Sequence, residues 1–401
     1  MRISTAQFYY QSAQQLSSLQ TNVNEQVEYL AAGKRVLTAK DDAVSYGSLT
    51  GLKNELANIE KYQRNITQAQ GRNTIQEVSF TDAENVMQEL KQIFIQANNG
   101  ALNSDDLSAL EGLAKNAQTQ LLGVANSKDE TGGFIFSGYS VGTQPFVIQS
   151  DNSVTYFGDS GVRELQIAKN VMVDTNQAGD RAFEGVNNSL GDFSAQYNTN
   201  TSGISLNRAI INDPSAYDTV NNPPDYNFNF ASATDLTVTD GLGNTVFSTN
   251  SYAPGQTIAF NGIEAQLSGN PLPGDDFNLT PQREISIFDT VKGIIDWVGA
   301  GASPPNSVQH SVDYKELLGQ LDKALDYMTS RRVDAGVRLK LIDNQASSNL
   351  DAELYLAKGQ SNIEDLDFAK AAADFERSRF SLQAAQQSFV QIKNLSLFNY
   401  L

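Results

Sequence analysis

The sequence predicts an α+β protein in which both chain ends form a long antiparallel helical coiled-coil rod carrying an inserted, mainly β domain. Residues 1–135 contain no proline and carry apolar residues at helical spacing. The β-branched and aromatic runs that follow are short and broken by turn residues, and helical spacing returns after residue 282. We expect an N-terminal inner helix (1–32), a connector (33–47) and the first part of the rod domain (48–133). The β domain (134–281), the second part of the rod domain (282–358) and a C-terminal inner helix (359–401) follow.

The first helix has an apolar stripe with seven-residue spacing. Such spacing keeps one narrow face of a helix directed at a partner helix. The stripe consists of Tyr9, Leu16, Val23 and Leu30, with Leu19 and Val27 adding turns to it.

Residues 48–127 are expected to fold back as an antiparallel helix pair. The first helix of the pair, 48–97, would be about 75 Å long, and Asn98-Asn99-Gly100 supplies the turn. Ser104 is the expected cap of the second helix, where Asp105 and Asp106 suit the positive end of the helix dipole. The apolar stripes of the pair are Leu49, Leu52, Leu56, Ile59, Ile66, Val86, Leu90, Ile93 and Ala97, then Leu107, Leu110, Ala114, Ala117, Leu121 and Val124.

The C-terminal zone is expected to be helical to its end. One helix carries Tyr314, Leu317, Leu321, Leu325 and Met328, and Val337, Leu341, Leu350 and Leu354 continue it. The last helix has Phe368, Phe375, Leu382 and Phe389 seven residues apart, with Ala371, Ser378, Ala385 and Ile392 three residues behind. Large apolar side chains then crowd the final eight residues and need cover from a partner: Leu395, Leu397, Phe398, Tyr400 and Leu401.

Composition restricts the possible functions. The formal net charge of −18 repels nucleic acid and anionic membrane surfaces, and the sequence has no apolar run long enough to span a bilayer. We therefore expect neither nucleic acid nor membrane as a partner. The absence of cysteine excludes thiolate chemistry, and the single histidine, His310, is expected in a solvated loop.

The stretch AAGKRVLTAKDDAVSYG, residues 31–47, concentrates charge in a way that resembles a catalytic or phosphate-binding loop. Gly33-Lys34 lacks the upstream glycine and the preceding strand of a phosphate loop, and Asp41-Asp42 lacks further metal ligands at suitable spacing. We interpret Gly33 as a left-handed helix cap, 34–40 as an extended connector, and the aspartates as acceptors at the start of the next helix.

No other motif predicts catalysis or a cofactor. DGLGNTV (240–246) and PGDDF (273–277) are hairpin turns between strands and do not meet the spacing of a calcium loop. G-x-S-x-G is absent, and one loop histidine cannot serve a catalytic triad. We expect no enzyme activity, metal or cofactor. A secreted adhesin or hydrolase on a coiled-coil stalk stays open as an alternative, with a pocket in residues 140–281.

Four segments resemble the bacterial flagellin family at matching ends of the chain. They are MRIST at the start, AAGKRVLTAKDDAVSYG, GGFIFSGYSVGTQPF at the entry to the β zone, and SNIEDLDFAKAAADF with SFVQIKNLSLFNYL at the end. Val36 and Leu37 replace the Ser or Asn typical of filament flagellin. This difference favours the family's subunits that join hook to filament over filament flagellin, which is the alternative.

The resemblance implies a structural subunit exported without a cleaved signal and located at the hook–filament junction of the flagellum. It implies self-association in a ring, contact with a neighbouring hook-associated protein and with flagellin, and an export chaperone on the C-terminal helix. It also implies that the inner helices order on assembly. The expected assembly interface is Leu16, Val23, Leu30, Lys34, Arg35, Asp41, Asp42, Phe368, Phe375, Leu382, Phe389, Leu395, Leu397, Phe398 and Leu401.

Overall fold

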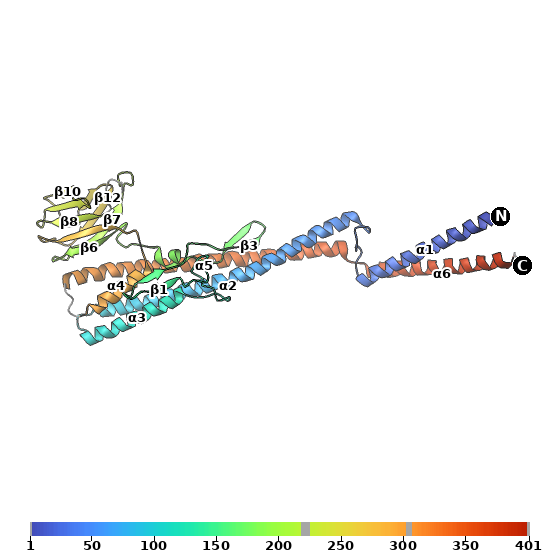
Figure 1. The fold of residues 1–401 in the computed structure, drawn as a ribbon, viewed down its shortest axis with the longest axis horizontal. Coiled ribbons are helices and arrows are strands. Elements are labelled where there is room, and N and C mark those ends of the chain that lie inside the picture. The colour runs from blue at the N-terminus through green and yellow to red at the C-terminus, as the bar shows by residue number, and fades with distance from the viewer. Residues whose placement is uncertain (1, 218–224, 302–306, 399–401) are drawn as a thin grey trace. The chain divides into compact units, whose positions relative to one another are not determined.

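The computed structural model describes residues 2–217, 225–301 and 307–398, and within these ranges side chains from residue 7 to residue 391. Its helices and strands confirm the α+β class, with long helices from both chain ends and an inserted β domain (Figure 1). Two compact units are present, Met1–Asn65 with Asn344–Leu401, and Ile66–Asp343. The helices are α1 (Arg2–Ala32), α2 (Ala43–Ala97), α3 (Ser104–Ala125), α4 (Ile287–Gly299), α5 (Ser307–Glu364) and α6 (Phe368–Phe398).

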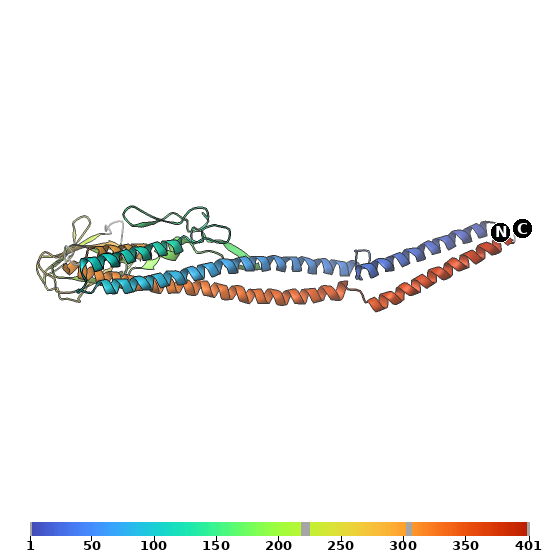
Figure 2. The same ribbon diagram turned by 90° about the horizontal axis from the view of Figure 1, so that it is seen from below.

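The first unit is built from α1, α6 and the adjoining parts of α2 and α5. Helices α1 and α6 are antiparallel, and the two chain ends lie together at one end of the pair (Figures 1 and 2). The connector between α1 and α2 spans residues 33–42, because α2 begins at Ala43 instead of residue 48 as expected. Helix α5 likewise extends to Glu364, past the expected boundary at residue 359.

The second unit has a helical core made by α2, α3, α4 and α5. Figures 1 and 2 show α3 alongside α2, as expected from the turn at 98–100. Ion pairs join α2 to α5, with 3.0 Å between Arg332 and Glu84 and 2.5 Å between Lys91 and Asp322. The expected stripe of α3 is buried except for its last member, Val124, which is half-buried.

Five phenylalanines lie at the centre of this helical core. Ring centroids of Phe136 and Phe183 are 5.0 Å apart with their planes at 84°, and Phe146 and Phe288 are 5.1 Å apart. Phe80 from α2 completes the group at 5.6 Å from Phe136. Tilted and edge-to-face pairs of this kind stabilise a core beyond the area they bury. The cluster therefore holds helices and the first part of the β zone in one core.

The β zone divides into two parts with different cores. Residues 134–187 pack on the helical core, whereas residues 193–281 form a separate sandwich with its own buried residues. The first part contains three hairpins or strand pairs and a π-helical turn, Asp180–Glu184. Its strands are β1 (Phe146–Ile148), β2 (Val154–Tyr156), β3 (Glu164–Ala168), β4 (Val171–Asp174), β5 (Val186–Asn187) and β14 (Glu284–Ile285).

The sandwich places a five-stranded sheet, in the order β10-β9-β8-β13-β6, against a three-stranded sheet, β11-β12-β7. All of its strand pairs are antiparallel. Alternate residues of β8, Tyr226, Phe228 and Phe230, point into the core, as a two-residue period requires. The strands are β6 (Phe193–Thr199), β7 (Ser205–Ile211), β8 (Tyr226–Phe230), β9 (Leu236–Asp240), β10 (Thr245–Thr249), β11 (Thr257–Phe260), β12 (Ile263–Ser268) and β13 (Asp276–Pro281).

Several expectations from the sequence are wrong in position. Helix α3 is capped by Asn103, whose side chain accepts from the N–H groups of Asp105 and Asp106, while Ser104 is already the first helical residue. The carboxylate of Asp106 accepts a hydrogen bond from the N–H of Asn103, and this second bond completes a capping box. The continued stripe on α5 faces outward, because large fractions of Val337, Leu341, Leu350 and Leu354 are exposed. Small and polar residues, Ala335 and Asn349 among them, are buried in their place.

The cap of α3 gives a direct test of this assignment. We expect Asn103→Ala to destabilise α3 by about 1 kcal/mol, because the amide group satisfies two N–H groups that have no other acceptor. Ser104→Ala, one residue away, should change stability by only a few tenths. Native-state hydrogen exchange of the α3 amides measures both. Equal effects of the two substitutions would contradict the capping box.

Candidate functional site

The described side chains of α1 and α6 form one seam between the two ends of the chain. Half-buried residues recur on α1 every three or four positions, and the matching residues of α6 do the same. Tyr9 contacts Phe389 edge-to-face, with 6.0 Å between ring centroids, which fixes the antiparallel register near the chain ends. The half-buried residues are Tyr9, Ser12, Leu16, Leu19, Val23, Glu25, Gln26, Tyr29 and Leu30 on α1, and Asp374, Phe375, Ser378, Leu382, Ala385 and Phe389 on α6.

The residues of the seam are only partly buried. Among the described side chains of α1 and α6, only Ala371 is buried. Two helices can shield only one face of each other, so a coiled-coil stripe in a pair stays partly wet. These helices therefore have an incomplete core in the single chain.

Some expected interface residues occupy other positions. Phe368 begins α6 and is 58% exposed, and Val27, expected on the α1 stripe, is 47% exposed. The side chains of Leu395, Leu397 and Phe398, and that of Ile392, lie outside the described residues, as do Tyr400 and Leu401 entirely.

Apolar residues on the outer faces of the helix pair were missed by the sequence reasoning. They lie next to seam positions instead of on them, so a search for seven-residue spacing does not find them. Exposed fractions range from 45% to 72%. The residues are Phe8, Tyr10, Phe380 and Val390.

The connector joins the two ends of the chain through backbone hydrogen bonds. Gly33 ends α1 with φ of +66°, in the left-handed conformation expected for a helix cap. Its carbonyl accepts from the N–H of Leu366 at 3.1 Å, and the N–H of Arg35 donates to the carbonyl of Glu364 at 2.7 Å. Lys34 and Asp365 thus form an antiparallel bridge. The junction of α1 with α2 is fixed to the junction of α5 with α6.

Glu364 is the central charge of this connector. Its side chain is 4% exposed, and Oε1 lies 2.7 Å from Nζ of Lys34 and 2.8 Å from Nζ of Lys53. Gln360 donates to the other carboxylate oxygen at 2.6 Å. Burial alone would raise the pKa of Glu364, but these hydrogen bonds outweigh it and lower the pKa to about 2. The carboxylate is therefore ionised and fully used within the chain.

The two aspartates of the connector accept hydrogen bonds, as the sequence indicates. Asp41 accepts from the N–H groups of Leu37 and Thr38 at 3.0 and 2.8 Å, and from the hydroxyl of Tyr29 at 2.9 Å. Asp42 accepts from the N–H of Ser45 at 3.0 Å, at the start of α2. The bond from Thr38 and that from Tyr29 lower the pKa of Asp41. Both aspartates shape the turn into α2.

Arg35 and Asp41 also line a groove of about 260 Å³ at this connector. The other lining residues come mainly from the first two turns of α6 and the end of α1, and all but Leu366 and Ala371 are charged or polar. Arg35 donates to the carbonyl of Ile363 at 3.0 Å, so its guanidinium is engaged on the chain's own backbone.

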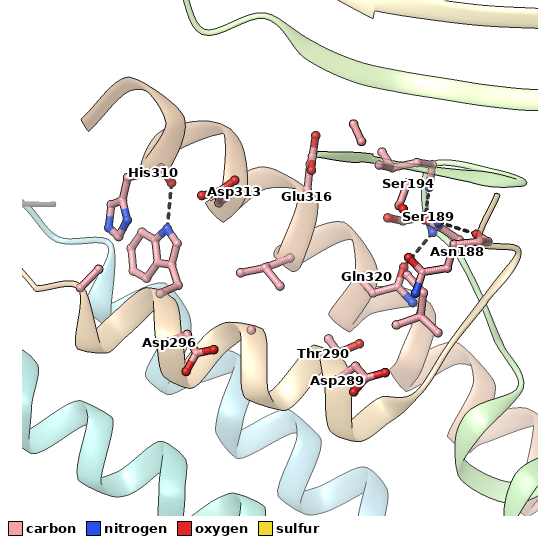
Figure 3. A pocket seen from close by; sticks show the side chains of 18 residues that line it. Asn188, Ser189, Ser194, Asp289, Thr290, Asp296, His310, Asp313, Glu316 and Gln320 are labelled. Carbon is pink, nitrogen blue, oxygen red and sulfur yellow. Dashed lines mark hydrogen bonds between the residues drawn. The ribbon is translucent and has the colours of Figure 1, made fainter. Parts of the chain in front are cut away.

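A second cavity, of about 490 Å³, lies between the sandwich and helices α4 and α5 (Figure 3). It is lined mostly by those helices and by residues 188–195, so it is not a pocket within the insertion itself. Its acidic lining, Asp289, Asp296, Asp313 and Glu316, disfavours anionic ligands.

Hydrogen bonds across this cavity attach the sandwich to α5. The hydroxyl of Tyr197 donates to Oε1 of Glu316 at 2.7 Å and accepts from the N–H of Leu206 at 2.8 Å. The N–H of Ser189 donates to Oε1 of Gln320 at 2.8 Å. Burial raises the pKa of Glu316 to about 7, against the smaller effect of the bond from Tyr197. The attachment therefore contains a carboxyl group that titrates near neutral pH.

His310 also lines this cavity, and its position corrects the expectation of a solvated loop. The residue lies in α5, with its ring stacked on Trp297 at 4.0 Å and 7° between planes. The indole N–H of Trp297 donates to the His310 carbonyl at 2.8 Å. Burial lowers the pKa of His310, which favours the neutral ring. The residue serves packing between α4 and α5.

The described residues hold neither a cluster of metal ligands nor a helix suited to a membrane. No group of three or more His, Asp or Glu side chains suited to a metal ion occurs in the part of the chain that the structure describes. Over the same residues, no helix combines the length and apolar character needed to cross a bilayer.

Two models of one family match the two helical ends of the chain. The bacterial flagellin N-terminal helical region matches residues 3–141, and the bacterial flagellin C-terminal helical region matches residues 318–401. Together these ranges cover more than half of the 401 residues. They include nearly all of α1, the whole of the connector, α2, α3 and α6, and most of α5.

Individual relatives point to the same family. The chain is 26% identical to flagellar hook-associated protein 3 of Escherichia coli over 46% of its own length. It is 22% identical to flagellin A of Vibrio cholerae over 93% of its length and 91% of that protein. The crystal structure of the flagellar junction protein FlgL from Legionella pneumophila superposes with a TM-score of 0.65 at 28% identity, covering 79% of this chain and 99% of that one.

The extent of these matches differs. The chain spans about half the length of the curated hook-associated relatives it matches, 58% of the Escherichia coli protein and 46% of the one from Salmonella typhimurium. The match to the junction-protein structure, in contrast, covers nearly all of that structure.

The connector gives the first prediction from this site. We expect Glu364→Gln to speed exchange of the Arg35 amide about tenfold at pH 7, since charged hydrogen bonds contribute about 1.5 kcal/mol when their lysines are partly exposed. Because the folded pKa is lowered, the stabilisation in the unaltered chain should be present above pH 4.5 and be lost as the pH falls toward 2.

Glu25→Gln is the matched control, because Glu25 forms only an exposed pair with Lys40 at 3.3 Å. Hydrogen exchange followed by mass spectrometry from pH 7 to pH 3 measures both variants. Protection of Arg35 that does not depend on Glu364 would contradict its role.

Glu316 should behave in the opposite sense. Its folded pKa is raised, so its stabilising contribution is present below pH 4.5 and is lost as the pH rises through about 7. We expect Glu316→Gln to stabilise the attachment of the sandwich at pH 8 by about 2 kcal/mol, and to have little effect at pH 4. Calorimetry at the two pH values measures the shift in unfolding temperature. Tyr197→Phe is the control and should destabilise the protein at both pH 4 and pH 8. A Glu316→Gln variant that is less stable than the unaltered chain at pH 8 would contradict the assignment.

Proposed function

The chain belongs to the bacterial flagellin family, and on that premise we propose that it is a structural subunit at the junction between the hook and the filament of the flagellum. The observation that carries the proposal is the close similarity of its fold to the flagellar junction protein of Legionella pneumophila. That similarity extends over nearly the whole of the solved chain, which includes more than the terminal helices shared by the family.

The geometry of the first unit supports an assembly role. Helices α1 and α6 leave their seam half-exposed and carry further apolar residues on their outer faces. A stripe with this much exposed apolar surface gains stability when further copies surround it. Copies of the chain would pack α1 and α6 side by side in a ring, with contacts along Leu16, Val23, Leu30, Phe375, Leu382 and Phe389 closing the inner layer.

The connector has a specific part in this proposal. Lys34, Arg35, Asp41 and Asp42 form bonds within their own chain, so they set the geometry of the connector instead of bonding directly to a neighbour. The connector would fix how the inner helices leave the rest of the subunit. Its influence on assembly would therefore act through the shape of the subunit.

The proposed neighbours follow from this location. On one side of the ring lies a hook-associated protein, and on the other lies flagellin. Before export, a chaperone would cover the C-terminal helix, which ends in Leu395, Leu397, Phe398 and Leu401. The protein would act outside the cell as part of the flagellum, with a structural and not an enzymatic role.

A filament flagellin is the second candidate, because the flagellin A match extends over almost the whole chain. The identity of that match is lower than that to the junction-protein structure. The two roles differ in copy number and position, and genetics separates them.

Deletion of the gene tests the proposal. We expect cells without this protein to keep their hooks, to lack attached filaments and to release flagellin into the medium, because flagellin would have no seat on the hook. Electron microscopy of the cells and gel analysis of the medium measure both effects. Supplying the unaltered gene in trans is the control. Attached filaments of normal length in the deletion strain would overturn the junction role, and loss of the filament subunit itself would favour flagellin.

A further inference from the structure

A groove between α2 and α3 carries acidic groups that form no ion pair with any side chain in the described part of the chain. It holds about 340 Å³ and is lined by Asp82, Asn85, Val86 and Glu89 from α2, and by Gln120 and Val124 from α3. Asp82 and Glu89 are exposed, and neither forms an ion pair with any residue that the structure describes.

The neighbouring charge on α2 behaves differently. Glu84 is directed at α5, where it pairs with Arg332 at 3.0 Å. The spacing of Val78, Asp82, Asn85 and Glu89, by four, three and four residues, places these four on one face of α2. Val78 is 48% exposed, so an apolar residue extends the groove by one turn. This face is open, apolar at its base and negative at its edge.

Helix α5 has an outward face of complementary character. Val333, Val337 and Leu341 are four residues apart, and 55%, 64% and 44% of their surfaces are exposed. Lys340 lies on the same face, is exposed, and forms no ion pair within the described ranges. Single exposed apolar residues are common, but a stripe of three beside an exposed lysine without an ion pair marks a contact surface.

We propose that this face of α5 in one copy lies in the α2–α3 groove of the next copy. The inference rests on the proposed function only in expecting several copies side by side. A second copy is the occupant that charge favours. In a chain with a net charge of −18, an apolar helix face that carries a basic residue is uncommon. The groove supplies the unpaired carboxylates with which such a face can form ion pairs.

The dimensions of the two surfaces agree. Val333 and Leu341 are about 12 Å apart along their helix, and Asp82 and Glu89 are about 10 Å apart along theirs. An amphipathic helix face lying in a groove between two helices is a common mode of recognition. Val337 would lie over Val86, and Lys340 would meet Asp82 or Glu89.

The two surfaces differ from each other, which determines the kind of assembly. A contact between unlike surfaces of identical chains runs head to tail. Repetition of such a contact closes into a ring or continues as a helix. A two-fold dimer, in which the same surface meets itself, is excluded by this pairing.

The absence of cysteine from the chain permits a direct test by crosslinking. Asn85→Cys places a thiol in the groove, and Val337→Cys places one on the α5 face. On oxidation, the double variant should give a ladder of dimers, trimers and larger products. A mixture of the two single variants should stop at dimers, and neither single variant alone should crosslink. The purified full chain at high concentration and intact cells are both examined.

Charge exchange gives a second, independent measurement on the same contact. We expect Lys340→Glu to reduce the yield of crosslinked product at least tenfold, and the further changes Asp82→Lys and Glu89→Lys to restore it. Lys169→Glu, an exposed charge in the turn between β3 and β4, is the matched control and should leave the yield unchanged.

Two results would overturn the proposal. One is the absence of the ladder in the double variant, and the other is dimer formation by Val337→Cys alone. If the ladder is absent while the variants still support attached filaments, the interface is wrong and the junction role stands. If deletion leaves filaments attached, the junction role fails, and the crosslinks of the purified chain still decide the interface.

Discussion

The pairing of α1 with α6 is the constraint on which the rest of the structure depends. Neither helix can shield its apolar stripe alone, and each finds its partner at the opposite end of a 401-residue chain. The chain between α1 and α6 must therefore leave the helix pair and return to it at the same end. The backbone bonds from Arg35 to Glu364 and from Leu366 to Gly33 show where the two paths meet.

Two buried glutamates show how surroundings give one side chain opposite properties. Glu364 receives two lysines and an amide, which compensate for its loss of water, so its pKa is low. Glu316 receives one hydroxyl and faces Asp313, so burial dominates and its pKa is high. The first fixes the connector at any ordinary pH, whereas the second makes the attachment of the sandwich sensitive to proton concentration.

Local features of the sequence predicted much of this fold. The stripe of Leu16 and Val23, the cap at Gly33 and the acceptors at Asp41 and Asp42 all follow from spacing and from local chemistry. These features depend on residues within a few positions of one another. The fold class follows from the same spacing, whereas the family is indicated by the resemblance of segments at both ends of the chain.

The wrong predictions concern features that depend on contacts between residues far apart in the sequence. His310 lies in α5 with its ring stacked on Trp297, and Val337 is exposed because Ala335 occupies the buried side of α5. The lysine partners of Glu364 cannot be recognised from spacing, since Lys34 and Lys53 lie more than 300 residues away in the sequence. The division of the insertion, with residues 193–281 forming a core of their own, also depends on long-range packing.

That division has a consequence for how the protein can vary. The sandwich enters and leaves at adjacent points, where Asn188 bonds to Arg283 and Gln282 bonds to Asp192. A segment whose two ends are adjacent can be lengthened, shortened or exchanged without moving the helices that carry it. The sandwich can therefore change in length or sequence while the helical packing that carries it is held constant.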